Sequence, residues 1–244
     1  PDNNKVSIAM VGKYVTLADS YVSVNQALVH AGAKIGKTVS IEWIDSETLN
    51  GNIENLAKFD GILIPGGFGV RGSEGIIKTA NFAREKNIPY LGICFGFQLA
   101  AVAFGRHACN FDDANSTEIA PTTKYPIIDL LPEQKNVSNM GGSLRLGANQ
   151  INVKENSLAH KIYKSNLITK RHRHRYEINK EYLGELTKKG MSFSAESDGG
   201  KRMEILEIPS HKFYLGVQFH PEFSSRPGFP EASFEAFVRA ASNS

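Results

Sequence analysis

Residues 90–103 read YLGICFGFQLAAVA, and this stretch decides the fold. Its apolar first part ends at Cys94, and a helix-like pattern begins after Gly96. Such a change predicts a buried strand that turns sharply into a helix. The cysteine stands at the turn, with Gly92 two residues before it and Gly96 two residues after it. This placement calls for a physical explanation, which depends on the elements around it.

The first ninety residues alternate between predicted strands and predicted helices. Short, continuous apolar runs are typical of strands that are buried on both faces, and residues with helical spacing separate them. This alternation predicts a parallel sheet with helices on both faces. We expect strands at 6–11, 39–44, 61–64 and 89–93, and helices at about 24–31 and 75–86.

The second half of the chain has a different pattern. Residues 110–147 are rich in Asn, Pro, Thr and Gly and predict loops with short strands. Two further strands are expected at 203–208 and 213–219, and an amphipathic helix at 234–241. Because the sequence contains no repeat, low-complexity tract or linker, we expect one domain over residues 1–244.

Composition excludes several classes of protein. The 244 residues are 41% hydrophobic and 22% charged, which excludes a disordered, fibrous or disulfide-rich protein. The net charge of +3 does not by itself indicate a nucleic-acid partner. Two cysteines separated by a predicted helix are typical of free thiols in a reducing cytosol. No apolar stretch is long enough to span a membrane and no signal peptide opens the sequence, so we expect a cytoplasmic protein.

A cysteine at a strand-to-helix turn has a chemical interpretation. The pattern G-x-C-x-G, from Gly92 to Gly96, is a nucleophile elbow with cysteine in place of serine, in which small neighbours avoid clashes across the turn. The N-terminus of the helix stabilises a thiolate at Cys94, and the N–H of Phe95 is placed to stabilise an oxyanion. An inert, buried cysteine is the alternative, and the five-residue pattern does not decide between the two.

A candidate base for this nucleophile lies in QFHPEF, residues 218–223. His220 directly follows a predicted strand, and Glu222 stands two residues later. If the chain stays extended there, both side chains project to the same side, and Glu222 orients the imidazole toward Cys94. A lone His or Glu is more often structural. Their combination with an elbow cysteine and a parallel sheet favours a Cys-His-Glu triad.

These features resemble the class I glutamine amidotransferases, whose catalytic unit is a Cys-His-Glu triad on an α/β fold. Further stretches are similar to the glutaminase domains of the CTP synthase family, and together they cover nearly the whole chain. The resemblance implies a flavodoxin-like, mostly parallel central sheet with helices on both faces. The stretches are GKYVTLADSYVSVNQALVHAG (12–32), PGGFGVRGSEG (65–75), ANSTEI (114–119), MGGSLRLG (140–147), RHRHRYEIN (171–179) and QFHPEFSSRP (218–227).

The resemblance implies catalytic roles for five residues. The family's nucleophile falls on Cys94, its base on His220 and its orienting acid on Glu222. The oxyanion donors would be the backbone N–H groups of Gly67 and Phe95. A glycine at 67 fits this role, because a residue without Cβ lets its amide approach a tetrahedral carbon closely.

The resemblance also implies how glutamine is held. Gln98, Glu118 and Arg175 match the family's substrate-binding residues, with a carboxylate facing the substrate ammonium and a guanidinium facing its carboxylate. Gly96 and Phe97 complete the expected substrate-binding set. Phe95 and Phe97 depart from the family, whose members usually carry Leu at the first of these positions and Met at the second.

The glycine-rich stretch at 65–75 invites two other interpretations. It matches neither G-x-G-x-x-G in register nor G-x-x-x-x-G-K-[ST], so dinucleotide and P-loop sites are not predicted. In the CTP synthase family this stretch is a flexible lid linked to activation by GTP, and glycines on both sides suit a hinge. Arg71 and Glu74 are the lid candidates.

The basic cluster RHRHR, residues 171–175, could also indicate binding of nucleic acid or phosphate. Without alternating aromatic residues or a wider basic face, this interpretation is weak, and we expect no nucleic-acid partner. Its two histidines lack the remaining ligands of a metal site, so we expect no metal.

The resemblance therefore implies hydrolysis of L-glutamine to glutamate and ammonia through a glutamyl thioester. The synthetase domain is absent from this chain. In the full-length protein, which is expected to be a homo-oligomer, that domain would use the ammonia to aminate UTP to CTP with ATP and Mg²⁺, and GTP would be the activator. No cofactor is expected in the present domain. The alternatives are an enzyme like γ-glutamyl hydrolase and a catalytically silent regulatory or assembly module of the same fold.

Overall fold

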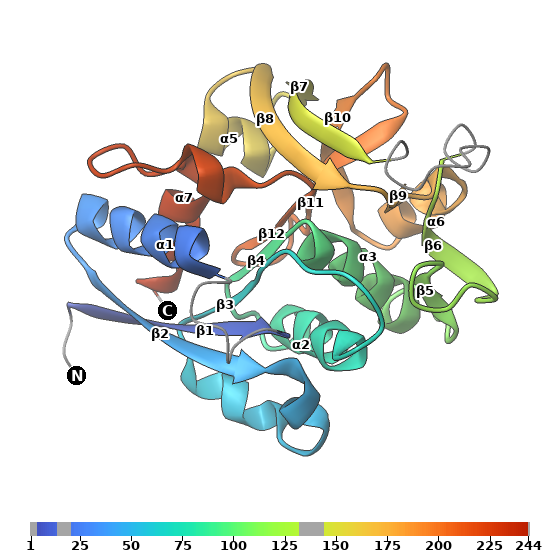
Figure 1. The fold of residues 1–244 in the computed structure, drawn as a ribbon, viewed down its shortest axis with the longest axis horizontal. Coiled ribbons are helices and arrows are strands. Elements are labelled where there is room, and N and C mark those ends of the chain that lie inside the picture. Colours follow the sequence, from blue (N-terminus) through green and yellow to red (C-terminus); the bar gives the residue numbers. More distant parts are fainter. Residues whose placement is uncertain (1–3, 14–20, 132–143, 244) are drawn as a thin grey trace.

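The computed structural model describes residues 4–13, 21–131 and 144–243. Within these ranges, nine strands form a central sheet in the order β2-β1-β3-β4-β12-β11-β10-β7-β8, shown in Figure 1. The strands are Lys5–Gly12 (β1), Thr38–Asp45 (β2), Gly61–Ile64 (β3), Tyr90–Ile93 (β4), Arg145–Val153 (β7), Leu167–His174 (β8), Ser192–Ser197 (β10), Arg202–Glu207 (β11) and Tyr214–Val217 (β12).

The first half of the sheet is parallel. Strands β2, β1, β3, β4 and β12 run in the same direction, with Ile93 opposite Val217 at the end of the β4–β12 pair. The strands expected at 6–11, 39–44, 61–64, 89–93 and 213–219 are confirmed here. Strands β3, β4 and β12 are buried along their whole length, and β2, at the edge of the sheet, is mostly half-buried.

Four long helices cover the two faces of the sheet: Val22–Ile35 (α1), Ser73–Glu85 (α2), Phe95–His107 (α3) and Ala232–Ala241 (α7). In Figure 1, α1 and α7 lie together on one side of the parallel strands, and α2 and α3 lie on the other. Two apolar cores result, one on each face of the sheet. The α/β fold with helices on both faces is thus confirmed.

The second half of the sheet is antiparallel, so the sheet is mixed rather than mostly parallel. Strands β12, β11, β10, β7 and β8 pair antiparallel in turn. The reason is local: β10 and β11 are joined by a turn at 198–201, and a connection that short can only join antiparallel strands. In strand β7, exposed positions alternate with buried or half-buried ones, a pattern that a search for continuous apolar runs does not detect.

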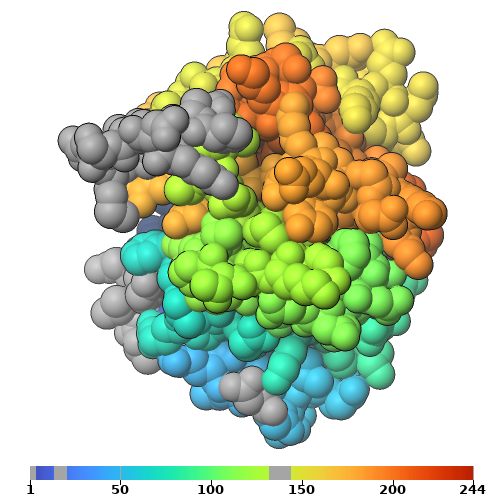
Figure 2. All heavy atoms as spheres, turned by 90° about the vertical axis from the view of Figure 1, so that its right-hand side faces the viewer, coloured from blue at the N-terminus to red at the C-terminus, as the bar shows by residue number. Residues whose placement is uncertain are grey.

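A small second sheet lies beside α3. Its strands are Ala114–Ser116 (β5), Tyr125–Asp129 (β6) and Glu177–Ile178 (β9), in the order β5-β6-β9. Figure 2 shows that the chain around 110–130 (yellow-green) covers the middle of one face of the molecule. Short strands were expected from 110 onward. The part of that expectation at 132–143 lies outside the described residues.

Short helices fill the remaining connections. They are Ser46–Gly51 (η2), Ile53–Lys58 (η3), Leu158–Tyr163 (α5), Lys180–Tyr182 (η5), Leu183–Lys188 (α6) and Pro221–Ser224 (η6). The parallel strands β1, β3, β4 and β12 all end at one edge of the sheet. Residues that directly follow them therefore converge, and open α/β sheets place their ligands at this edge.

Candidate active site

The turn after β4 has the geometry of a nucleophile elbow. Cys94 has φ 49° and ψ −95°, a strained conformation for a residue with a side chain. A Cβ on Gly92 would lie 2.8 Å from the backbone of Gly96, and a Cβ on Gly96 would lie 2.4 Å from the carbonyl oxygen of Ile64. The clash predicted across the turn is confirmed, and the two glycines are sterically required.

Backbone hydrogen bonds hold Cys94 at the start of α3. Its N–H donates to the carbonyl oxygen of Val217 at 2.7 Å, and its own carbonyl oxygen accepts from the N–H of Gln98 at 3.1 Å. The Cys94 side chain is buried, with Sγ 3.7 Å from Nε2 of Gln218 and 3.9 Å from the carbonyl oxygen of Arg173. The N-terminus of α3 and the Gln218 amide thus place partial positive charge near the sulfur.

His220 and Glu222 form the expected pair, but not for the expected reason. Nδ1 of His220 lies 2.8 Å from Oε1 of Glu222. The chain is not extended here, because Pro221–Ser224 is the 3₁₀ helix η6 with His220 at its N-cap. A Cβ on Gly66 would lie 2.9 Å from Cε1 of His220 and 3.8 Å from Cβ of Cys94, so both side chains flank this glycine.

The surroundings of His220 favour its charged form. Burial alone would lower the pKa of its imidazole, but hydrogen bonding and charge from Cys94 and Glu222 outweigh burial and raise this pKa to about 11. Because Nδ1 is held by Glu222, Nε2 is the ring atom left for Cys94. An imidazolium at this place puts positive charge beside the Cys94 sulfur.

A cavity of about 540 Å³ opens over the elbow. It brings together six residues predicted from the sequence, which come from five separate segments of the chain. These residues are Gly67, Cys94, Gln98, Glu118, Arg175 and His220.

Two buried glutamine side chains connect the cavity to the sulfur. Nε2 of Gln98 donates to the carbonyl oxygen of Tyr176 at 2.8 Å and lies 3.2 Å from Oε1 of Gln218. The Gln218 amide then presents its Nε2 to Cys94. Gln98 is therefore held by Tyr176 and Gln218, and Gln218 links it to Cys94.

Glu118 lies in the cavity with cationic groups around it. Its Oε1 accepts a hydrogen bond from the N–H of Gly69 at 3.0 Å. Burial raises the pKa of the Glu118 carboxyl, and the Gly69 N–H, Lys13 and Arg175 act in the opposite direction. Glu118 and Arg175 therefore place groups of opposite charge in the lining of one cavity.

The structure qualifies the expectation for Gly67. A Cβ at this position would meet no protein atom closer than Cδ1 of Phe95 at 3.5 Å, which is ordinary contact. Of the two neighbouring glycines, Gly66 is the one at which a side chain would collide with protein atoms. Phe95 and Phe97 are buried, and their side chains, like Gly96, do not line the cavity.

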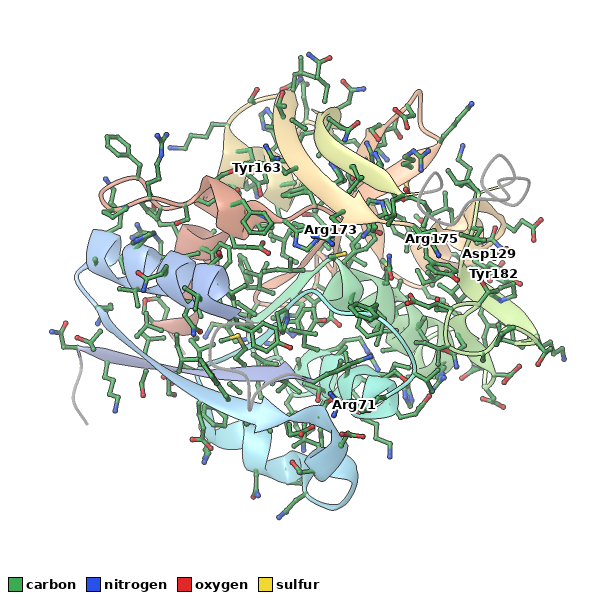
Figure 3. All side chains as sticks on the ribbon, viewed as in Figure 1. Arg71, Asp129, Tyr163, Arg173, Arg175 and Tyr182 are labelled. Atoms are coloured by element: carbon green, nitrogen blue, oxygen red, sulfur yellow. The ribbon has the colours of Figure 1, made fainter. Side chains whose placement is uncertain are left out.

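The lid candidates Arg71 and Glu74 lie outside the cavity lining. Arg71 pairs with Glu47 at 3.0 Å, and Figure 3 shows it well apart from Arg173 and Arg175. Glu74 forms two hydrogen bonds with Arg106, at 2.7 and 3.1 Å. Their role in a lid stays a prediction.

Several cavity residues were missed by the sequence analysis. Gln218, which contacts Cys94 from outside the cavity lining, was also missed although it directly follows β12 at the edge where sites form. Tyr176 and Leu144 gave no signal, because loops bring them to the cavity. The missed lining residues are Tyr21, Gly66, Phe68, Leu144, Arg173, His174 and Tyr176.

The two histidines of the basic cluster have protein partners. Nε2 of His172 lies 2.8 Å from Glu204, and Nε2 of His174 lies 2.8 Å from Glu177. In the described part of the chain, no three His, Cys, Asp or Glu side chains are grouped so that they could hold a metal ion. Nor does that part contain a helix of the length and apolar character that a membrane span needs.

Comparison with known proteins identifies the family. The family model "Glutamine amidotransferase class-I" matches residues 16–240. The chain belongs to this family. Its fold is also similar to that of a glutamine amidotransferase from Thermotoga maritima, with a TM-score of 0.53 at 11% identity over 98% of this chain and 94% of that chain.

Within the family, the chain is similar to CTP synthases. It is 52% identical to "CTP synthase" of Archaeoglobus fulgidus over 97% of this chain and 44% of that protein. It is also 52% identical to "CTP synthase" of Staphylococcus epidermidis, over 99% of this chain and 45% of that protein. The chain therefore spans less than half of these curated relatives. A structure of the Trypanosoma brucei CTPS glutaminase domain with bound acivicin matches with a TM-score of 0.92 at 38% identity, covering 98% of this chain and 94% of that one. The resemblance to the glutaminase domains of CTP synthases is thus confirmed.

Proposed function

We propose that this amidotransferase domain hydrolyses L-glutamine to glutamate and ammonia at Cys94. The observation that carries the proposal is the elbow itself. A strained, buried cysteine faces a histidine whose other nitrogen is fixed at 2.8 Å by Glu222, inside a cavity that also presents Glu118 and Arg175. This is the arrangement of an activated nucleophile with an oriented base.

In the first half of the proposed reaction, the Cys94 thiolate attacks the side-chain amide carbon of glutamine. The N–H groups of Gly67 and Phe95 stabilise the oxyanion of the tetrahedral intermediate. The His220 imidazolium gives its proton to the amide nitrogen, the C–N bond breaks, and ammonia leaves. A glutamyl thioester remains on Cys94.

In the second half, His220 accepts a proton from a water molecule that attacks the thioester carbon. The tetrahedral intermediate collapses, the C–S bond breaks, and glutamate leaves with the thiolate regenerated. Glu222 holds the imidazole in one orientation through both steps, since its carboxylate stays on Nδ1.

Glu118, Arg175 and Gln98 select the substrate in this proposal. Glu118 binds the α-ammonium and Arg175 binds the α-carboxylate, so an L-amino acid is held at both charges. Gln98, whose Nε2 donates to the carbonyl oxygen of Tyr176, lines the same cavity as these groups and the nucleophile.

The similarity to CTP synthases suggests where the ammonia goes. We propose that the whole protein contains a synthetase part that uses it to aminate UTP with ATP and Mg²⁺, that GTP activates this transfer, and that the whole protein forms a homo-oligomer. In this proposal the glutaminase step uses only protein groups of this domain and a water molecule, without a cofactor. A silent regulatory module is disfavoured, because the complete Cys94, His220 and Glu222 arrangement and its buried supports are present.

Release of glutamate from glutamine tests the proposal. Wild-type protein and Cys109→Ala, which changes the cysteine away from the cavity, should release glutamate at similar rates. Cys94→Ala should lose at least about 10³-fold of this activity, because the nucleophile is gone. Equal activity of Cys94→Ala and wild type would contradict the proposal. Preference for a γ-glutamyl peptide over glutamine would favour the γ-glutamyl hydrolase alternative.

A further inference from the structure

Lys13 is a buried cation that the proposed reaction leaves without a role. It directly follows β1 at the edge of the sheet where the active site lies, and only 4% of it is exposed. Its Nζ donates to the carbonyl oxygens of Phe68 at 2.8 Å and Gly69 at 2.5 Å. Burying an ammonium is costly unless its donors are satisfied, so these contacts hold the side chain and the two carbonyls in one arrangement.

The loop that Lys13 contacts is held by polar contacts rather than by burial of its large apolar side chains. Phe68 and Val70 are 67% and 61% exposed, so apolar burial does not anchor them. Gly69 and Gly72 adopt left-handed conformations, with φ 77° and 67°. Glycine is the residue with the most conformational freedom to lose, so such a loop needs outside contacts to keep one shape.

Lys13 supplies contacts at both ends of this loop. Its ammonium holds the carbonyls of Phe68 and Gly69, and its own carbonyl oxygen accepts a hydrogen bond from Nη2 of Arg71 at 2.8 Å. Glu118 adds a further contact through the N–H of Gly69. The residue that directly follows β1 thus contacts three of the four positions from Phe68 to Arg71.

The same ammonium also touches the other side of the oxyanion site. Its Nζ lies 4.2 Å from the centroid of the Phe95 ring, within the range of a cation–π interaction. Gly67 directly precedes the carbonyls that Lys13 holds, and Phe95 follows Cys94. Lys13 therefore connects the two segments whose N–H groups would stabilise the oxyanion.

We propose that Lys13 is a positioning residue for the oxyanion site, which it keeps assembled by fixing the 66–71 loop against Phe95. This inference rests on the proposed function, since it assigns a purpose to the Gly67 and Phe95 amides. Burial lowers the pKa of Lys13 to about 8, against the opposing charge of Glu118, which agrees with an ammonium held mainly by neutral carbonyls. Lys13 itself does not touch the reacting atoms.

Two reagents separate positioning from general stability. Iodoacetamide alkylates a thiolate by direct displacement and needs no oxyanion site. A diazo-ketone analogue of glutamine needs the substrate pocket and the carbonyl-binding amides. We would measure the rate of Cys94 modification by each reagent in wild type, in Lys13→Met and in Lys58→Met. Lys58 is a matched control, because its Nζ lies 4.8 Å from the Phe59 ring and it is exposed, away from the cavity.

Lys13→Met should react with the glutamine analogue at least about tenfold more slowly, since small misplacements of catalytic groups cost this much or more. Its reaction with iodoacetamide should stay within about twofold of wild type. Hydrogen exchange in a peptide spanning the 66–71 loop should become faster in the same variant. Lys58→Met should behave as wild type in all three measurements.

Equal rates with the glutamine analogue in Lys13→Met and wild type would overturn the inference. A parallel loss with both reagents would also overturn it, because Lys13 would then only stabilise the fold. If Lys13→Met does not fold, Lys13→Gln, which retains a shorter donor, replaces it with the same outcomes. Failure of the wild-type protein itself to react with the glutamine analogue would instead contradict the proposed function.

Discussion

The two halves of the central sheet bury different kinds of side chain. In the parallel half, the strand interiors are apolar, and Ile8, Leu63 and Leu91 have no exposed surface. In the antiparallel half, Glu204 on β11 is equally buried but is charged, and it contacts Arg145 on β7 and His172 on β8. One half is assembled by apolar burial, and the other by burial together with ion pairs.

This difference separates two requirements of the site. The elbow needs a rigid turn, and the parallel half provides it by close packing around Gly92 and Gly96. The substrate pocket needs charged groups. Strand β8 carries Arg173 near its end, and Arg175 directly follows the strand; Figure 3 labels both residues. Buried ion pairs contribute little net stability, but they fix the arrangement of the elements that carry them.

Removing the central carboxylate of the antiparallel half should have the largest effect on stability. Glu204→Ala leaves Arg145 and His172 buried without their partner, which costs about 3–5 kcal/mol. Glu235→Ala is the control, because it breaks an Arg–Glu pair at 2.7 Å on the exposed side of α7 and should cost about 0.5 kcal/mol or less. Denaturant unfolding measures both. Similar losses of unfolding free energy in the two variants would contradict the claim that buried ion pairs help to assemble the antiparallel half.

Acid should weaken the same network to a smaller extent. Burial would raise the pKa of Glu204, but His172, Arg145 and Ser197 outweigh it and lower this pKa from 4.5 to about 2. The contribution of a carboxyl with a lowered pKa is present above 4.5 and is lost as the pH falls toward 2. The loss is on the order of 2–3 kcal/mol for such a shift.

The measurement is the free energy of unfolding of wild type and Glu204→Ala between pH 6 and pH 3. We expect a steeper decline in wild type, since only wild type has this carboxyl to protonate. Parallel curves would show that Glu204 does not couple the antiparallel half to pH.

A test of the parallel half should give the smallest of the three effects. Gly96→Ala places a Cβ 2.4 Å from the carbonyl oxygen of Ile64, and relief of such overpacking costs about 1–3 kcal/mol. Gly184→Ala, in α6 with no atom within 4 Å of the added Cβ, should leave stability unchanged or raise it by up to about 1 kcal/mol. Thermal unfolding that does not distinguish these two alanines would show that the elbow tolerates bulk.

Some parts of this molecule could be predicted from sequence alone, for physical reasons. The parallel strands could be predicted because strands buried on both faces need continuous apolar runs. The elbow could be predicted because steric limits at Gly92 and Gly96 leave a local trace. The pairing of His220 with Glu222 was predicted, but the 3₁₀ turn that produces it was not, because Pro221 is compatible with both conformations.

Other parts depend on contacts between distant residues, which leave no local pattern in the sequence. The β10–β11 hairpin carried a usable signal in Asp198-Gly199, which is typical of tight hairpin turns. Strands β7 and β8 had none, since their buried polar residues find partners only in the folded sheet. The contact of Lys13 with Gly69 joins positions far apart in the chain, so neither residue predicts the other.

The central claim is that Cys94 is a nucleophile directed at glutamine, and covalent trapping tests it most directly. The protein would be treated with the diazo-ketone analogue of glutamine and its intact mass measured, with Cys94→Ala as the control and excess L-glutamine as the competitor. We predict a single adduct that requires Cys94 and that glutamine prevents. No adduct, or an adduct of equal yield in Cys94→Ala, would contradict the claim.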